Sequence, residues 1–214
     1  MGTDRKVEYG MSALRNSARK ALPPDYRLVR RLEIGSRRTF ILLNVGSVGT
    51  LAVGALFFFG VDRLLVALNI TPWIDVPLNS DTQFAFSILA IVMVILMLSF
   101  HEVCHGLAFR AFGAQPHYGI NWRKAVAYAR ADQYYLPRNA YIVTALAPLI
   151  VISLLTVIVM ALTGGGLRSV VALTGSANVG GAVGDLWFTA VCLRYPRRLL
   201  VRDFGEGAEL FTAP

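Results

Sequence analysis

The segment HEVCH, from His101 to His105, carries the residues of this chain whose types and spacing most clearly permit chemistry. On a helix, side chains four positions apart lie on one face, one turn from each other. Two imidazoles placed in this way can hold one zinc ion, and a tetrahedral zinc site needs at least one further protein ligand. Glu102 follows His101 by about 100° around the helix axis. In the H-E-x-x-H pattern, which is typical of metal-dependent proteases, this glutamate acts as the general base.

The surroundings of the motif favour a functional role. It lies near the end of a long apolar run, Phe84 to Phe109, where ionisable side chains are costly and usually functional. The alternative is structural: two histidines that are satisfied by hydrogen bonds between packed helices, with Glu102 bonded to a neighbour. Cys104, within the motif, and Cys192 are predicted to be small buried packing residues with reduced thiols rather than metal ligands.

Composition predicts the elements that must position the motif. The chain has 214 residues, of which 55% are hydrophobic, and a mean hydropathy of +0.54; this is too apolar for an ordinary soluble domain. The predicted fold class is an all-α polytopic membrane protein with four transmembrane helices and a small cytoplasmic β-sheet. Each span approaches or exceeds the ~20 residues that a bilayer crossing requires. The spans run from about Phe40 to Gly60, Phe84 to Phe109, Ala140 to Leu162 and Val170 to Leu193.

The distribution of positive charge predicts an orientation. Arg and Lys cluster before the first span, between the second and third spans, and after the fourth. By the positive-inside rule, the protein is then a multi-pass integral protein of the cell membrane with both termini cytoplasmic. The expected organisation is a basic cytoplasmic segment (1–38), a membrane domain (39–193) and a basic cytoplasmic tail (194–214). The net charge of +8 then reflects topology and contact with anionic lipid, and no nucleic-acid partner is expected.

A second carboxylate is predicted to complete the site. Of the 13 acidic residues, only Glu102 and Asp185 fall within the four spans as drawn, and an unpaired carboxylate there would be expensive. Asp185 lies about nine residues before Arg194, and His101 about nine before Arg110, so at ~1.5 Å per residue both lie at one depth. Asp185 is therefore predicted to be the third metal ligand. The alternative is that Asp185 does not bind the metal, and instead contacts a metal-binding side chain or forms a polar contact between two helices.

The fourth span is predicted to be broken. Its segment Thr174 to Gly181 (TGSANVGG) is a poor helix interior, and non-helical backbone at membrane depth occurs only where it lines a cavity. Asn178 in this segment is predicted to have a catalytic role, as a hydrogen-bonding group for substrate backbone or an oxyanion. In the third span, Pro148 is expected to kink the helix and to leave backbone carbonyls that need other partners.

The cytoplasmic loop between the second and third spans has two segments with strand character. They are His117 to Trp122 and Ala125 to Tyr135, around a turn at Arg123-Lys124; Tyr26 to Ile34 is a further strand that could join them. An open strand edge beside the motif could take up an extended peptide by strand addition. Alternatively, the sheet only closes the cytoplasmic mouth. His117 is expected to be a surface residue rather than a metal ligand.

Four stretches of the sequence carry a resemblance to a known family. They are LPPDY (22–26), HEVCH, ALAPLIVIS (145–153) and the Asn178 to Asp185 region. Together they resemble small four-helix bacterial and archaeal membrane proteins described as zincin peptidases, which are similar to the site-2 intramembrane metalloproteases. The resemblance implies that His101, His105 and Asp185 bind zinc and that Glu102 is the base.

The chain departs from the site-2 pattern in two places. Asp185 stands in Gly-Asp-Leu rather than Leu-Asp-Gly, and Asn178 is not followed by proline. The expected function is a Zn²⁺-dependent intramembrane peptidase that hydrolyses a membrane-embedded or membrane-associated peptide near the cytoplasmic side. The alternatives are a metal-binding membrane protein or permease without catalysis, and a zinc hydrolase of a non-peptide membrane substrate.

Overall fold

The computed structural model describes residues 17–121 and 126–214. Most of the basic N-terminal segment and the predicted turn at Arg123-Lys124 lie outside these ranges. The chain forms two compact units, and each is described by itself. Of the described residues, the first unit comprises 17–40, 102–121, 126–147 and 185–214, and the second comprises 41–101 and 148–184.

Within the described residues, three helices are long and apolar enough to cross a membrane: α2 (Arg37–Ala67), α3 (Ser80–Ala111) and α4 (Arg138–Leu162). They correspond to the first three predicted spans. Large apolar side chains lie on their outer surfaces, including Leu42 (71% exposed) and Phe84 (77% exposed). A soluble protein avoids such broad apolar surfaces, whereas helices in lipid require them. Because α2 extends to Ala67, Asp62 lies in its last turns rather than in a loop.

The fourth apolar region contains two shorter helices, α5 (Gly165–Gly181) and α6 (Val183–Leu193), separated at Ala182. The span is therefore interrupted, but the prediction that Thr174 to Gly181 is non-helical is wrong. Its glycines serve helix packing: a Cβ on Gly175 would lie 2.5 Å from the Thr156 Cγ2, and one on Gly180 would lie 3.1 Å from the Leu51 Cβ. Small residues at such contacts let helix backbones approach closely.

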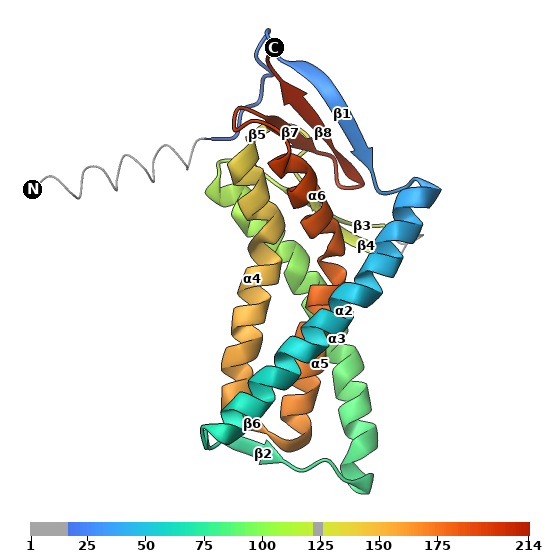
Figure 1. The fold of residues 1–214 in the computed structure, drawn as a ribbon, viewed down its shortest axis with the longest axis vertical. Coiled ribbons are helices and arrows are strands. Elements are labelled where there is room, and N and C mark those ends of the chain that lie inside the picture. Colours follow the sequence, from blue (N-terminus) through green and yellow to red (C-terminus); the bar gives the residue numbers. More distant parts are fainter. Residues whose placement is uncertain (1–16, 122–125) are drawn as a thin grey trace, which may run out of the picture. The chain divides into compact units, whose positions relative to one another are not determined.

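A four-stranded antiparallel sheet belongs to the first unit (Figure 1). Its strand order is β1-β8-β7-β5, and the strands are β1 (Arg27–Glu33), β5 (Leu136–Pro137), β7 (Leu200–Asp203) and β8 (Gly207–Thr212). β1 confirms the strand predicted at Tyr26 to Ile34, but its partner is β8. β1 does not pair with the strands predicted after the motif helix, from His117 to Tyr135. The segment 194–214, expected to be a basic tail, contains β7 and β8, which pair as a hairpin.

The core of this unit lies between the sheet and the neighbouring ends of the helices. Its fully buried side chains include Leu136, Leu199, Val201 and Leu210, and Phe109 near the end of α3 belongs to the same cluster. The C-terminal hairpin is thus part of the core that holds the end of the motif helix.

Two small two-stranded sheets complete the fold. β3 (His117–Asn121) and β4 (Val126–Arg130) pair antiparallel, which confirms a hairpin in the loop after α3, although β4 is shorter than predicted. In the second unit, β2 (Ile74–Val76) pairs in parallel with β6 (Thr163–Gly164). This pair joins the connection that follows α2 to the connection that follows α4.

Candidate metal centre

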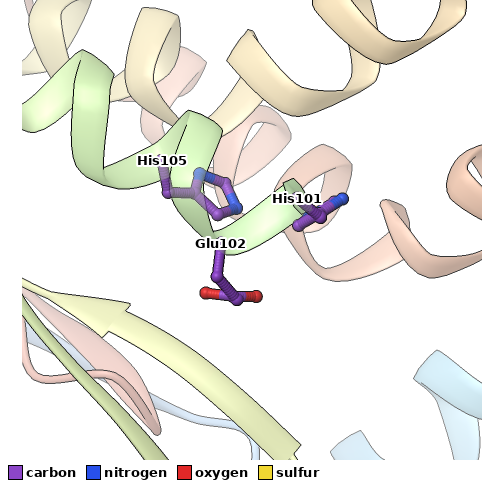
Figure 2. A group of neighbouring side chains, drawn as sticks. All are labelled: His101, Glu102 and His105. Atoms are coloured by element: carbon purple, nitrogen blue, oxygen red, sulfur yellow. The ribbon is translucent and has the colours of Figure 1, made fainter. Parts of the chain in front are cut away.

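The motif residues His101, Glu102 and His105 lie on adjacent turns of α3, as the periodicity predicts (Figure 2). One potential ligand atom from each lies within 4.8 Å of the others. His101 is buried, with 8% of its surface exposed. Among residues 17–121 and 126–214, this is the group of His, Cys, Asp or Glu side chains with the spacing of a metal site. The donor types suit zinc, which binds imidazole nitrogen and carboxylate oxygen.

His105 contacts two other helices through its two ring nitrogens. Its Nδ1 lies 2.9 Å from the backbone carbonyl oxygen of Thr144 in α4, and its Nε2 lies 3.4 Å from Oδ1 of Asp185 in the first turn of α6. With zinc–ligand bonds of ~2.0–2.2 Å, adjacent ligand atoms of a tetrahedral site are about 3.3–3.5 Å apart. The separation of His105 and Asp185 fits two ligands of one ion. The assignment of Asp185 as a ligand stays a prediction.

His101 contacts the side chain that was predicted to be catalytic. Its Nδ1 lies 3.0 Å from Oδ1 of Asn178 in α5. The Asn178 side chain is fully buried, and its Nδ2 donates to the carbonyl oxygen of Pro148, at 3.4 Å. Both ends of this amide therefore have protein partners. The predicted contact of Asn178 with substrate is untested, and its observed contact is with a candidate ligand.

Glu102 is connected to the hairpin that follows α3. Its Oε2 accepts a hydrogen bond of 2.8 Å from the backbone N–H of Ala129 in β4. Along an antiparallel strand, successive N–H groups point alternately toward and away from the partner strand. The N–H of Ala129 points to Glu102 and not to β3. The outer edge of β4 thus faces the motif.

The remaining predicted candidates lie elsewhere. His117 is in β3, opposite Arg130, and is not a member of the His101–Glu102–His105 group. Cys104 and Cys192 are both buried, as expected of packing residues.

One polar group in the first unit was not predicted. Asp203, at the end of β7, accepts hydrogen bonds from the hydroxyl of Tyr141 in α4, at 3.1 Å, and from the backbone N–H of Gly205, at 2.8 Å. Burial raises the pKa of Asp203 from 3.8 to about 6, although the Gly205 N–H opposes this effect. An acidic residue in a basic tail gives no sequence signal of this kind, because the signal depends on the strand pairing.

The comparison with protein families is consistent with this geometry. Residues 84–200, more than half of the chain, match the profile of a family described as "Putative zincin peptidase". The matched range contains the His101–His105 motif, Asn178 and Asp185. No curated protein and no solved structure is significantly similar to the chain. The chain belongs to the family of these zincin-type peptidases.

Proposed function

We propose that this protein is a zinc-dependent intramembrane peptidase that cleaves a membrane-embedded or membrane-associated peptide near the cytoplasmic side. One observation carries the proposal: the metal-type group of His101, Glu102 and His105 lies on α3, a helix long and apolar enough to cross a membrane. Membership of the zincin family supports zinc as the ion and peptide hydrolysis as the reaction. When bound, zinc polarises the scissile carbonyl and lowers the pKa of a water molecule.

His101, His105 and Asp185 are the proposed zinc ligands. The distance of 3.4 Å between the His105 Nε2 and the Asp185 Oδ1 supports this set, and so does the bond of each histidine Nδ1 to an uncharged oxygen. A histidine that donates from Nδ1 carries its lone pair on Nε2. Nε2 is then the nitrogen that binds the metal.

Glu102 is the proposed general base. Its carboxylate takes a proton from the attacking water as the oxygen bonds to the scissile carbonyl carbon. When the C–N bond breaks, Glu102 gives this proton to the leaving amine. The hydrogen bond from Ala129 holds the carboxylate beside β4. The proposed role of the outer edge of β4 is to align an extended peptide by strand addition. An extended substrate suits hydrolysis, because a helix shields its own peptide bonds.

A different ligand set is the main competing arrangement. One carboxylate oxygen of Glu102 lies within 4.8 Å of a ring nitrogen of each motif histidine. Glu102 could therefore replace Asp185 as the third metal ligand, and the site would then lack its general base. The two arrangements predict opposite results for two conservative substitutions. If Asp185 is the ligand, Glu102→Gln keeps about one zinc per chain and Asp185→Asn loses it. The reverse pattern would assign Glu102 to the metal.

The decisive experiment combines metal analysis with turnover in the purified, membrane-reconstituted protein. Transmembrane peptides with a reporter at each end are offered to the wild type and to Glu102→Gln. We expect cleavage by the wild type and a loss of at least about 10²-fold in Glu102→Gln, which retains its zinc. Zinc binding without cleavage of any peptide would favour a non-catalytic metal protein or permease. Cleavage of lipid-linked, non-peptide compounds would indicate another hydrolase.

A further inference from the structure

The Nδ1 atom of each motif histidine lies within hydrogen-bond distance of an uncharged oxygen. For His101 the oxygen is Oδ1 of Asn178, and for His105 it is the backbone carbonyl of Thr144. In a neutral histidine one ring nitrogen carries the proton and the other the lone pair, and the hydrogen bonds that the two nitrogens make decide which is which. A carbonyl or amide oxygen can only accept a hydrogen bond, so each contact requires a proton on Nδ1.

Pro148 makes the oxygen of Thr144 available to His105. In a regular helix, the N–H of residue 148 would bond to the carbonyl of residue 144, but proline has no N–H. Pro148 lies inside α4, so the Thr144 carbonyl has no donor from that position of its own helix. Thr144 is 1% exposed, and a buried carbonyl requires a partner other than bulk water. The Nδ1 of His105, at 2.9 Å, is that partner.

Pro148 also orients the amide that contacts His101. The carbonyl oxygen of Pro148 accepts from the Nδ2 of Asn178, at 3.4 Å. This bond distinguishes the two ends of the amide, because only the nitrogen end can donate. The oxygen end therefore faces the His101 Nδ1. Since Asn178 is fully buried, water does not compete for either end.

We propose that Pro148 and Asn178 are positioning residues that hold His101 and His105 in the Nδ1–H tautomer and present both Nε2 atoms to one metal ion. The inference rests on the proposed function, in which these Nε2 atoms bind zinc. It assigns a chemical role to a helix-breaking residue: the missing N–H of Pro148 supplies one histidine with its acceptor, and its carbonyl fixes the acceptor of the other.

Pro148→Ala is the sharpest test, because the role of a backbone carbonyl cannot be removed by changing Thr144. Alanine restores an N–H that competes with His105 for the Thr144 oxygen, and it also gives α4 one more hydrogen bond. We expect zinc affinity to fall by about tenfold or more, while the melting temperature of the zinc-free protein is unchanged or higher. If the proline only shaped the helix, stability would change but zinc affinity would not.

Two substitutions separate the functions of the Asn178 amide. Asn178→Leu keeps similar volume but removes the acceptor, and we expect zinc affinity to fall by about 10–100-fold. Asn178→Asp loses the bond to Pro148. Both carboxylate oxygens are acceptors, however, so an oxygen faces His101 in either orientation of the side chain, and the variant should retain most of the zinc affinity. Ser176→Ala is the matched control: Ser176 is also buried in α5, and its hydroxyl bonds to the Ala172 carbonyl of its own helix.

The experiment measures two quantities on the full chain in detergent or nanodiscs. Zinc affinity is obtained by competition with a chromophoric chelator, and the tautomers are obtained from imidazole ¹⁵N chemical shifts of the zinc-free protein. The chain has three histidines, so His117→Ala and the two motif variants assign the spectrum. We expect Nδ1–H signals for both motif histidines in the wild type. Pro148→Ala should lose the Nδ1–H signal of His105, and Asn178→Leu should lose that of His101.

The outcomes separate this inference from the proposed function. Nε2–H tautomers in the wild type, or unchanged tautomers and zinc affinity in Pro148→Ala and Asn178→Leu, would overturn the inference while leaving a zinc peptidase in place. A wild type that binds no zinc would overturn the proposed function. If Pro148→Ala does not fold, the wild-type tautomers and the contrast between Asn178→Leu and Asn178→Asp decide.

Discussion

At the scale of single residues, the sequence was most informative where chemistry depends on spacing along one helix. The H-E-x-x-H pattern placed His101 and His105 on one face of α3, and the structure has them there. Contacts between side chains of different helices were harder to predict from the sequence. The depth argument indicated Asp185, which lies beside His105, but no periodicity could show that Asn178 bonds to His101.

The first residue-scale prediction concerns the metal. His101→Ala and His105→Ala each remove one imidazole donor, and they should lower zinc content from about one per chain to a small fraction of that value. His117→Ala is the matched control, since His117 lies in β3 outside the group, and it should retain zinc. Metal analysis of the three purified variants checks this. Full zinc occupancy after both motif histidines are replaced would refute the proposed site.

The second residue-scale prediction concerns the pH dependence of stability. Because the pKa of Asp203 is about 6 in the folded protein against 3.8, the folded state binds more protons than the unfolded state between these values. The free energy of unfolding should therefore fall as pH rises from about 4 to about 6, by roughly 1–3 kcal/mol from this group.

Asp203→Asn cannot ionise and should not show this contribution. The difference in unfolding free energy between the variant and the wild type should grow in favour of the variant between pH 4 and pH 7. Titrating groups that do not interact with Asp203 contribute equally to both proteins and cancel in the difference. Thermal unfolding followed across this range makes the measurement, and parallel curves for the two proteins would show that Asp203 ionises normally.

At the scale of elements, length and hydropathy were sufficient for the three long helices, but local propensity misjudged two segments. The glycines of α5 suggested a break, yet they allow close contact with Thr156 and Leu51 inside a helix. The C-terminal hairpin was missed because its charged residues read as a polar tail. Glu209 in β8 is in fact buried and accepts from the Arg202 Nε at 2.9 Å, a cross-strand pairing that no local pattern reveals.

The hairpin should therefore be essential to the fold. Leu210 in β8 is fully buried in the core that also contains Phe109 of α3, and Leu210→Ala should cost about 2–5 kcal/mol of stability. Leu42→Ala, at a position that is 71% exposed on α2, is the control and should cost far less. Denaturation of both variants in the same detergent provides the comparison. Equal effects would mean that the tail is peripheral.

The edge of β4 offers a test of substrate approach. Because the N–H of Ala129 faces Glu102, alternation places the N–H of Ala127 at the same edge and that of Tyr128 toward β3. Ala127→Pro then removes one edge donor without breaking a bond to β3. If substrate adds to this edge, the variant should retain zinc and show a several-fold higher KM.

Tyr128→Pro serves as the comparison for this edge, because it breaks the pairing with Gly119 of β3. It should disturb the hairpin itself and lower kcat as well as substrate affinity. An Ala127→Pro variant with zinc, native stability and unchanged KM would indicate that the hairpin only covers the site and that substrate enters elsewhere.

At the scale of the whole molecule, strand pairing constrains how the chain crosses the membrane. β1 precedes α2, β5 separates α3 from α4, and β7 follows α6, yet all three belong to one sheet. If α2, α3 and α4 each cross the bilayer, α5 and α6 must together make the return crossing. Their 17 and 11 residues span about 40 Å at ~1.5 Å per residue, which is sufficient.

The pairing of β2 with β6 agrees with this topology, because it joins the two connections that would lie on the opposite side. Four crossings, with both termini and the loop after α3 in the cytoplasm, stay a prediction of hydropathy and the positive-inside rule. The apolar runs of the sequence predict the spans, and the distribution of Arg and Lys predicts their orientation. Neither signal could show the sheet that joins β1, β5 and the C-terminal hairpin, because that sheet depends on pairing between distant strands.

Single cysteines test the topology in a background where Cys104 and Cys192 are replaced by alanine. Trp73→Cys, at a site 85% exposed in the connection after α2, should react with a membrane-impermeant maleimide only from outside intact cells. Arg27→Cys in β1 and Arg197→Cys after α6 should react only in inside-out vesicles, because β1 and the C-terminal hairpin belong to one sheet. Labelling of Arg197→Cys from outside would mean that α5 and α6 do not complete a crossing, and Asp185 could not then lie at the depth that the proposed zinc site requires.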